Sequence, residues 1–291
     1  MNLLLIGASS FIGKNIKEYF EPVYCLKAPT HWELDILNLE GLKRYLSQYD
    51  FDVVINCAMY NKTFNHPDML EQSLRMFYNL KSCSALYKKM IYFGSGAEYG
   101  KQRDISLARE GDIGRIIPHN YYGLAKYAIN QSISEHDNIL NLRLFGVYGK
   151  YEDYNSKFIS NMILDSIYGL PQVINQNSLF DYLYIHDFLK ILNYFINHDT
   201  IYKDINVCRG KGVFLSEIAQ YICEKYSGNK NVILKNKELG LEYTGSNERL
   251  LSVIGDFPFT DLSVGIDELY YWYEENIEGI KYDKVRGKNG Y

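Results

Sequence analysis

A chain of 291 residues in which 47% are hydrophobic can fill the core of one large α/β unit with a smaller second domain, so a protein that is disordered throughout is excluded. The formal net charge of −4 creates no broad positive field, which argues against nucleic acid as a partner and leaves any anionic ligand dependent on local cations. The five cysteines form neither a C-x-x-C pair nor a cluster with zinc-ligand spacing, so we expect no metal site, no disulfide framework and a reducing cytosol.

The chain begins directly with a strand-like run at residues 3–6, without a basic leader or a cleavage site. No apolar stretch approaches the ~18 residues that a membrane span needs. We therefore expect a soluble cytoplasmic protein with no membrane partner.

The first half of the chain alternates short apolar runs with amphipathic segments. This alternation predicts a doubly wound parallel sheet, and runs that are apolar on both faces are typical of strands covered by helices on each side. We expect strands at 3–6, 23–26, 52–56, 90–93 and 139–144, and helices at 13–20, 39–48, 69–88 and 122–136.

The alternation stops after the fifth strand, and a polar, aromatic stretch leads into short mixed elements and a last helix-like segment at 265–277. We predict an α/β protein whose first domain spans 1–150 and takes back parts of 180–208. A smaller second domain is expected at 151–291. Residues 281–291 are polar, charged and glycine-containing, which is typical of a loose tail.

A glycine-containing turn, GASSFIG at residues 7–13, follows the first strand and opens the first helix. Backbone N–H groups and the positive end of a helix dipole at such a turn can hold a pyrophosphate, and glycine leaves the phosphate unobstructed. Ser10 occupies the middle glycine position of the G-x-x-G-x-x-G pattern. The motif alone therefore also fits an ordinary strand-to-helix turn.

The residues after the second strand indicate which dinucleotide is bound. An acidic residue there binds the ribose 2′-hydroxyl of NAD, whereas a basic residue suits the 2′-phosphate of NADP. Lys27 therefore favours NADP(H) over NAD(H), with a solvated surface lysine as the alternative. Asp35 and Ile36 are placed to meet the adenine, with a turn-capping aspartate as the alternative.

Tyr122 and Lys126 are four residues apart at the start of a helix-like segment, so their side chains share one face. A free tyrosine has a pKa of ~10, and a nearby ammonium together with the positive nicotinamide ring favours the phenolate, which brings the group closer to the working pH. Only this pair lies between the fourth and fifth strands. The same spacing occurs elsewhere in Tyr221 with Lys225 and in Tyr226 with Lys230.

Ser95 lies at the end of the fourth strand, within GSGAEYG at residues 94–100. Ligands bind at the carboxyl ends of strands in open α/β sheets, so the Ser95 hydroxyl is placed to hydrogen-bond a reacting oxygen. We expect Ser95, Tyr122 and Lys126 to form one catalytic set, and a plain loop serine is the weaker alternative for Ser95.

In order and spacing, these motifs resemble the extended short-chain dehydrogenase/reductase family of NAD(P)-dependent nucleotide-sugar epimerases, dehydratases and reductases. The resemblance covers nearly the whole chain. Its motifs are 7–13, Asp35-Ile36, 52–58, 94–100, 122–126, 143–149, 181–187, Asn206-Val207 and Trp272.

The resemblance implies a Rossmann-type nucleotide-binding domain followed by a substrate-binding domain. It implies that Tyr122 is the proton-transferring acid/base, that Lys126 orients the nicotinamide ribose and acidifies Tyr122, and that Ser95 steadies the sugar oxygen. It also implies a homodimer joined by a four-helix bundle from the helices at 69–88 and 122–136. The implied cofactor contacts are Gly7, Ser9, Ser10, Phe11, Ile12, Gly13, Lys27, Asp35, Ile36, Cys57, Ala58, Met59, Tyr122, Lys126 and Phe145.

Two positions after Ser95 narrow the reaction. Dehydratases of the family carry an Asp-Glu pair where this chain has Gly96 and Ala97, and its decarboxylases carry glutamate at the position of Ala97. The stretch 27–38 most resembles GDP-fucose synthases, whose epimerising cysteine and histidine fall on Ala97 and Lys157. With both missing, the resemblance implies an NADPH-dependent reductase of the 4-keto group of a nucleotide-linked 4-keto-6-deoxy sugar, with the proton supplied by Tyr122.

Two other functions stay open. The same catalytic set serves an NAD-dependent nucleotide-sugar 4-epimerase or 4-dehydrogenase, against which Lys27 argues mildly. A non-enzymatic dinucleotide sensor on the same fold would not need Tyr122 and Ser95 together.

The substrate contacts follow the resemblance less closely. An arginine common in the family is Phe180 here, and an asparagine common in the family is Gly146. The expected contacts are Ser95, Gly96, Lys157, Arg209 and Arg249, with Arg249 first as a diphosphate contact and the three cations otherwise solvated surface charges. The sequence does not identify the nucleotide base.

Overall fold

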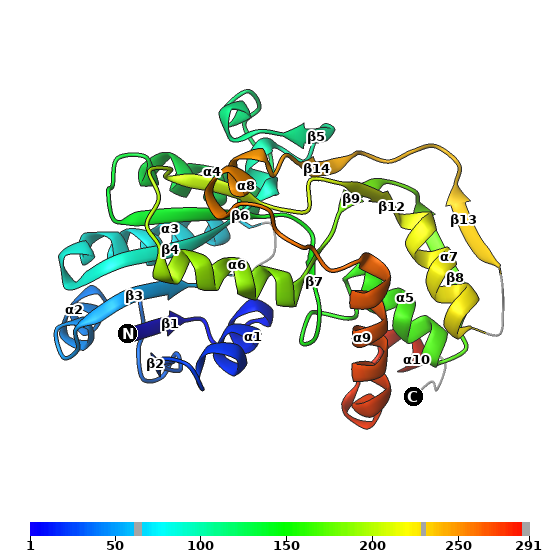
Figure 1. The fold of residues 1–291 in the computed structure, drawn as a ribbon, viewed down its shortest axis with the longest axis horizontal. Helices are drawn as coiled ribbons and strands as arrows, with labels where there is room; N and C mark the ends of the chain where they lie inside the picture. Colours follow the sequence, from blue (N-terminus) through cyan, green and yellow to red (C-terminus); the bar gives the residue numbers. More distant parts are fainter. Residues whose placement is uncertain (61–65, 228–230, 287–291) are drawn as a thin grey trace.

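The computed structural model describes residues 1–60, 66–227 and 231–286 (Figure 1). A six-stranded sheet forms its centre in the order β11-β6-β4-β3-β1-β2, and every neighbouring pair is parallel. The predicted α/β fold with a doubly wound parallel sheet is confirmed. The strands are β1 (Asn2–Ile6), β2 (Cys25–Lys27), β3 (Phe51–Asn56), β4 (Tyr87–Ser95), β6 (Ile139–Leu144) and β11 (Asp204–Val207).

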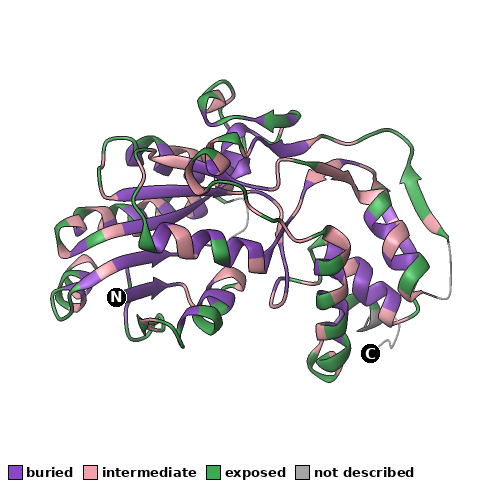
Figure 2. Cartoon of the chain, viewed as in Figure 1, coloured by how far each residue is buried: buried purple, intermediate pink, exposed green. Residues whose placement is uncertain are grey.

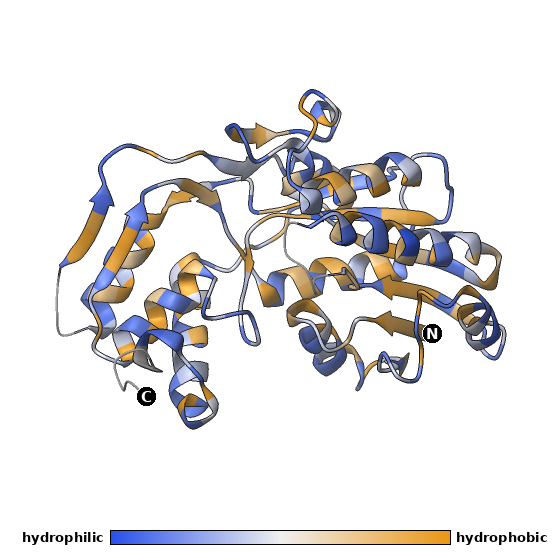
Figure 3. Cartoon of the chain, turned by 180° about the vertical axis from the view of Figure 1, so that it is seen from behind, coloured by the Kyte–Doolittle hydropathy of each residue, from blue (hydrophilic) through white to orange (hydrophobic). Residues whose placement is uncertain are grey.

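Helices cover both faces of this sheet, because consecutive side chains of a strand point to opposite faces. Leu3 and Leu5 of β1 belong to the core under α1 and α6, whereas Leu4 and Ile6 belong to the core under α2, α3 and α4. Figures 2 and 3 show the result as buried, hydrophobic strands between helices with exposed polar faces. The helices are α1 (Phe11–Phe20), α2 (Leu39–Leu46), α3 (Pro67–Ser82), α4 (Tyr121–Ile133) and α6 (Ile185–Asn197).

The boundary between α3 and β4 differs from the prediction, which extended the helix to residue 88. The helix ends at Ser82, a short 3-10 turn η1 (Ser84–Leu86) follows, and β4 begins at Tyr87. The Tyr87 phenol donates to the carbonyl of Leu80 at 2.9 Å and holds this turn against the end of α3. Apolar residues on both sides of the turn had made it look like a continuous helical pattern.

The remaining elements lie mainly beyond the carboxyl ends of the strands (Figure 1). A four-stranded sheet in the order β12-β9-β14-β5 joins β5 of the first half to β14 near the end of the chain. The strands are β5 (Ile105–Ala108), β7 (Val147–Tyr148), β8 (Gln172–Gln176), β9 (Leu179–Asp181), β10 (Leu183–Tyr184), β12 (Gly212–Phe214), β13 (Val232–Asn236) and β14 (Tyr243–Gly245). The helices are α5 (Phe158–Ile167), α7 (Leu215–Tyr226), α8 (Glu248–Ile254), α9 (Leu262–Glu275) and α10 (Asp283–Arg286), with 3-10 turns η2 (Gly96–Tyr99), η3 (Glu110–Asp112) and η4 (Ile277–Gly279).

The start of the predicted loose tail is instead packed. Tyr282 is 2% exposed, and its phenol contacts the carbonyl of Asn161 at 3.1 Å and the carboxylate of Asp165 at 2.8 Å. Lys284 pairs with the same carboxylate at 2.6 Å. A buried acid on α5 therefore fixes this segment, while residues 287–291 of the predicted tail lie outside the described residues.

Within the described ranges, no helix is long and apolar enough to cross a membrane, and no cluster of three or more His, Cys, Asp or Glu side chains could hold a metal ion.

Candidate active site

The glycine turn at the amino end of α1 brings backbone segments so close together that a Cβ would not fit between them. Gly7 has a φ of +81°, which favours glycine, and a Cβ on Gly13 would lie 2.2 Å from the carbonyl oxygen of Gly7. The Ser10 hydroxyl donates to that carbonyl at 2.8 Å and accepts from the N–H of Gly13 at 3.1 Å. Ser10 thus caps α1 in place of the expected glycine, and the first turn carries no acidic residue to repel a phosphate.

The other expected cofactor contacts lie mostly along the carboxyl edge of the sheet. Lys27 is exposed at the end of β2, with its ammonium 5.2 Å from the ring centroid of Tyr49. Asp35 accepts from the N–H of Leu37 at 3.0 Å, which is the turn-capping role considered as its alternative. Cys57, after β3, donates its N–H to the carbonyl of Ile6 at 2.9 Å, which places residues 57–59 beside the glycine turn.

Phe145 is an exception among these residues. Its side chain is 1% exposed, and its ring lies 5.1 Å from the ring of Tyr243 and 6.2 Å from that of Tyr99. The structure therefore places this side chain in a buried aromatic cluster rather than on an open surface.

Ser95 and Tyr122 converge at the carboxyl end of β4. Ser95 is the last residue of that strand, and Tyr122 lies in the first turn of α4, which the side chain of Asn120 caps by accepting from the N–H of Gly123 at 2.7 Å. Burial raises the pKa of Tyr122, and a side-chain hydrogen bond with Ser95 opposes that rise. The two hydroxyls therefore act on one another in the same site.

Lys126 lies one helical turn beyond Tyr122 and is 6% exposed. Its ammonium donates to the carbonyl of Phe93 at 2.5 Å, and it lies 4.5 Å from the ring centroid of Tyr92 and 5.9 Å from that of Tyr122. Burial lowers the pKa of Lys126 to about 8, against the opposing effects of Glu98 and Cys57. A buried ammonium of this kind favours the anionic form of a neighbouring phenol.

The two other Tyr-x-x-x-Lys pairs lie elsewhere. Lys225 donates to the Tyr221 phenol at 3.0 Å and pairs with Asp267 at 2.5 Å, so it belongs to an ion pair between α7 and α9. Tyr226 also hydrogen-bonds Asp267, and Lys230 lies outside the described residues.

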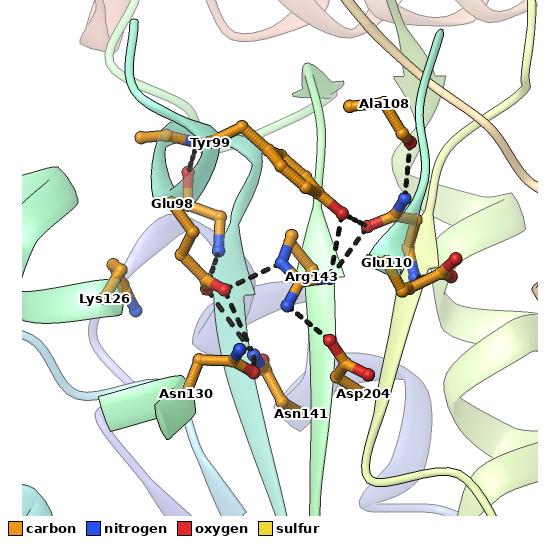
Figure 4. Close-up of polar contacts among 12 residues, drawn as sticks. Glu98, Tyr99, Ala108, Glu110, Lys126, Asn130, Asn141, Arg143 and Asp204 are labelled. Atoms are coloured by element: carbon orange, nitrogen blue, oxygen red, sulfur yellow. Dashed lines mark hydrogen bonds and ion pairs between the residues drawn. The ribbon is translucent and has the colours of Figure 1, made fainter. Parts of the chain in front are cut away.

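A buried ionic network next to Ser95 includes Glu98, Arg143 and Asp204 (Figure 4). Glu98, which is fully buried, accepts from the backbone N–H of Ser95 at 2.9 Å and from Nε of Arg143 at 2.7 Å. Arg143 is also fully buried and pairs with Asp204 at 2.6 Å. Burial opposes the Arg143 charge, but the carboxylates of Glu98 and Asp204 help to hold its pKa above the usual value. The network thus ties β4, β6 and β11 together directly behind Ser95.

Sequence reasoning missed this network. Glu98 and Arg143 entered the sequence analysis only as members of the motifs at 94–100 and 143–149, and no ion pair between them was predicted. The usable signal was the charge itself, since Arg143 lies inside a mostly apolar strand and a buried charge needs a partner.

Two lysines from different elements, Lys101 and Lys157, lie close enough to act on one another electrostatically. Lys157 precedes α5 and is exposed, and Lys101 follows η2. Lys101 is exposed overall, but its ammonium lies 4.0 Å from the ring centroid of Tyr243. Loss of water contacts, and then the positive charge of Lys157, lower the pKa of Lys101 to about 8. Neither lysine has an ion-pair partner in the part of the chain that the structure describes. They form a pair of cations able to meet an anion, of which the sequence had indicated only Lys157.

Arg209 and Arg249 were expected to contact the substrate, and the structure gives both of them protein partners. Arg249 pairs with Asp204 at 2.8 Å and lies 3.6 Å from Glu110, so its charge is already matched at the edge strand β11. Arg209 donates its backbone N–H to the buried carboxylate of Asp181 at 2.9 Å. These contacts do not place either guanidinium at the hydroxyls of Ser95 and Tyr122.

The two departures from the family pattern have local reasons. A Cβ on Gly146 would lie 2.4 Å from the backbone oxygen of Asp181, so no larger side chain fits there. Phe180 packs its ring 5.5 Å from that of Tyr243 and 5.9 Å from that of Tyr182, where an arginine would interrupt the aromatic cluster.

A cavity of about 690 Å³ lies between α5 and β8, next to Lys157 in the sequence. Its wall combines apolar and amide side chains with charged ones. The residues that line it include Asn155, Phe158, Asn161, Asp165, Val173, Ile174, Lys235 and Lys284.

Comparison with known proteins decides the family. Residues 3–208 match the model of the NAD dependent epimerase/dehydratase family. The chain belongs to this family. The predicted membership is therefore confirmed, and the chain is an enzyme that uses a nicotinamide dinucleotide.

Two curated relatives align with this chain over nearly their full length. GDP-L-colitose synthase of Yersinia pseudotuberculosis is 26% identical, with 95% of this chain and 99% of that enzyme covered. GDP-6-deoxy-D-talose 4-dehydrogenase of Aggregatibacter actinomycetemcomitans is 23% identical, with 93% and 97% covered. Among solved structures, a GDP-L-fucose synthetase of Naegleria fowleri bound to NADP superposes with a TM-score of 0.80 at 18% identity, covering 95% of this chain and 94% of that one, which shows the shared fold.

The geometry fits the chemistry of an epimerase/dehydratase family member. The cradle at Gly7 and Gly13 has no room for a Cβ and can receive a dinucleotide pyrophosphate. The bound nicotinamide would supply or accept a hydride, and the protein must then supply or accept a proton at the same sugar oxygen. Ser95, Tyr122 and Lys126 lie together at the carboxyl end of β4, and hydroxyl and ammonium groups of this kind can take part in such a proton transfer.

Proposed function

We propose that this protein is an NADPH-dependent reductase of the 4-keto group of a GDP-linked 4-keto-6-deoxy sugar, acting without epimerising the neighbouring carbons. The observation that carries the proposal is a complete Ser95, Tyr122 and Lys126 set beside positions 96 and 97 that hold only glycine and a buried alanine. Neither residue can abstract a carbon-bound proton. The site can therefore serve redox at one carbon but lacks a base at these positions for its neighbours.

A bound nicotinamide would supply a hydride to carbon 4 of the sugar, and Tyr122 donates a proton to the ketone oxygen. Ser95 donates a hydrogen bond to that oxygen and stabilises its developing negative charge. Lys126 stabilises the Tyr122 phenolate that the transfer leaves behind, until solvent returns the proton. The products are the 4-hydroxy sugar and the oxidised dinucleotide.

The nucleotide assignment draws on the names of the relatives, on two lysines and on the cavity between α5 and β8. Both curated relatives are named for GDP-linked deoxy sugars. We assign the diphosphate to the cations Lys101 and Lys157, and the base to the cavity between α5 and β8. Lys27, exposed at the end of β2, is assigned to the 2′-phosphate of NADPH.

We also propose a homodimer through α3 and α4. These helices lie side by side, and Lys81 of α3 donates to the hydroxyl of Ser132 on α4 at 2.6 Å. Tyr78 on α3 is 45% exposed, which leaves apolar surface for a second copy to cover. Light scattering after size exclusion would report twice the chain mass for a dimer, and the mass of one chain would contradict it.

The test of the reaction mixes the purified protein with NADPH and GDP-, dTDP- or CDP-linked 4-keto-6-deoxyhexoses and follows the loss of reduced-cofactor absorbance. The proposal expects consumption with the GDP sugar that Tyr122→Phe abolishes. The second relative is named a 4-dehydrogenase, so oxidation of the 4-hydroxyl, the reverse reaction, stays the alternative. Tightly bound NAD(H) released on denaturation, together with no NADPH consumption, would favour an epimerase or dehydrogenase instead.

A further inference from the structure

A buried acid holds the backbone of Ser95 in place. Glu98, which is fully buried in the 3-10 turn η2, accepts from the Ser95 N–H at 2.9 Å. Strand β3 ends at Asn56, which pairs with Tyr92, so among the described strands only β6 runs beside the last residues of β4. The Glu98 carboxylate therefore fixes the end of β4 at the point where one neighbouring strand has stopped.

The same turn fixes the Ser95 hydroxyl. Its oxygen accepts from the N–H of Ala97 at 3.2 Å, and the Glu98 side chain forms the reciprocal half of this capping box. A serine hydroxyl has one proton and two lone pairs. Because the Ala97 N–H occupies one lone pair, the Ser95 proton must point away from η2. It can then be donated to an oxygen that enters at the carboxyl end of β4.

Glu98 is itself held by its second carboxylate oxygen. Arg143, fully buried, donates from Nε to Oε2 of Glu98 at 2.7 Å, whereas the Ser95 amide donates to Oε1. Asp204 pairs with the same guanidinium at 2.6 Å (Figure 4). Gly94 leaves room for this arrangement, since a Cβ there would lie 2.2 Å from Oε1. The carboxylate is thus divided between one ionic partner and the amide of Ser95.

We propose that Glu98 is a positioning residue: held by Arg143, it fixes the Ser95 backbone so that the Ser95 hydroxyl points at the keto oxygen of the substrate. This role rests on the proposed reductase function. Glu98 does not touch the reacting atoms, because both of its oxygens have partners inside the protein. A hydrogen bond weakens steeply when its angle is lost, so a small rotation of Ser95 should slow the reaction and change substrate binding little.

A double-mutant cycle tests this role, with NADPH and GDP-4-keto-6-deoxymannose as the probe and each rate divided by the folded fraction from circular dichroism. Ser95→Ala should lower kcat about 100- to 1,000-fold, the usual effect of removing a donor to a developing oxyanion. Glu98→Gln should lower kcat about 10- to 100-fold with KM changed less than about threefold, since it misdirects a contact that strengthens only as charge develops. In the Ser95→Ala protein, the added Glu98→Gln change should cost less than about twofold, because the hydroxyl that Glu98 positions is gone.

Asp187→Asn is the matched control. Asp187 is also a fully buried carboxylate that accepts a backbone N–H, from Thr260 at 2.7 Å, and it lies 3.9 Å from the ammonium of Lys190. Its replacement should leave kcat within about twofold of the wild type. Equal losses of kcat from Glu98→Gln with and without the Ser95 hydroxyl would overturn the positioning role. If Glu98→Gln does not fold, Glu98→Asp takes its place in the cycle, because aspartate keeps the charge but is too short to reach both donors.

The amide signal of Ser95 in a proton NMR spectrum tests the contact without turnover. With serine alone isotope-labelled, this signal is the one that Ser95→Ala removes, and a carboxylate acceptor moves its proton to high chemical shift. Glu98→Gln should move the signal to lower shift, whereas Asp187→Asn should leave it in place; an unmoved signal in Glu98→Gln would overturn the role of Glu98. A wild-type protein that reduces none of the keto sugars would instead contradict the proposed function, and the amide signal would then decide whether Glu98 positions Ser95.

Discussion

The buried pair of Glu98 and Arg143 makes the strongest stability prediction. Glu98→Gln keeps the shape of the side chain but removes its charge and replaces one acceptor oxygen with an amide that can only donate. The Glu98 carboxylate now accepts from Ser95 N–H at 2.9 Å and from Arg143 Nε at 2.7 Å, so one of these donors would face another donor. Arg143, fully buried, would keep Asp204 as its remaining ionic partner.

Removing one member of a buried ion pair costs about 3 to 5 kcal/mol when the other charge is left uncompensated. Asp204 still compensates part of the Arg143 charge, so we expect the lower end of this range, about 3 kcal/mol. We expect Glu98→Gln to lower the free energy of unfolding by this amount in urea, followed by far-ultraviolet circular dichroism. The matched control is Glu248→Gln, which removes a carboxylate from an exposed pair with Arg109 at 3.0 Å. An exposed pair contributes about 1 kcal/mol or less.

A loss below about 1 kcal/mol for Glu98→Gln, or a loss equal to that of the Glu248 control, would refute the reasoning. That result would mean that Arg143 and Glu98 do not form a desolvated pair.

Three further predictions concern the cofactor, the pH dependence and the end of the chain. Lys27→Asp should shift the ratio of kcat/KM for NADPH over NADH by at least about tenfold toward NADH, since about 1.4 kcal/mol of phosphate attraction corresponds to a factor of ten; an unchanged ratio would make Lys27 a surface lysine. The rate of keto reduction should be level below pH 7 and fall as the pH rises past 8, because the pKa of Lys126 is lowered to about 8 and its charge is lost above that value. Lys101 has a similar pKa, so the fall must persist in Lys101→Met if Lys126 causes it. Tyr282→Ala should lower the free energy of unfolding by about 3 to 5 kcal/mol, the cost of truncating a large buried ring. Unchanged stability would mean that Tyr282 does not pack against α5 and that the segment is loose, as the sequence had predicted.

The sequence predicted the features that depend on local pattern. Hydrophobic periodicity located the central strands and their helices, because a strand covered on both faces must be apolar throughout. The spacing of Tyr122 and Lys126, and the position of Ser95 at a strand end, were enough to bring these three residues together.

Features that depend on pairing between distant segments were not predictable in this way. The Tyr243 phenol lies beside Gly96 because β14 pairs with β5, and nothing near Tyr243 in the sequence indicates that register. Arg249 was expected to meet a diphosphate, but the structure pairs it with Asp204 at the edge of the sheet. Ser10 looked like a departure from a glycine motif, although it supplies the cap that the turn needs.

The central claim is that the protein reduces the 4-keto group without epimerising the neighbouring carbons, and isotope exchange tests it most directly. The reaction should be run in D2O with NADPH and GDP-4-keto-6-deoxymannose, beside an enzyme-free sample that measures spontaneous exchange, and the product examined by proton NMR and mass spectrometry. The account predicts a single 4-hydroxy product with no deuterium on carbons 3 and 5 beyond the enzyme-free level, because Gly96 and Ala97 cannot remove a proton. Enzyme-dependent deuterium at either carbon, or an inverted configuration there, would contradict it and require a base that this site has not revealed.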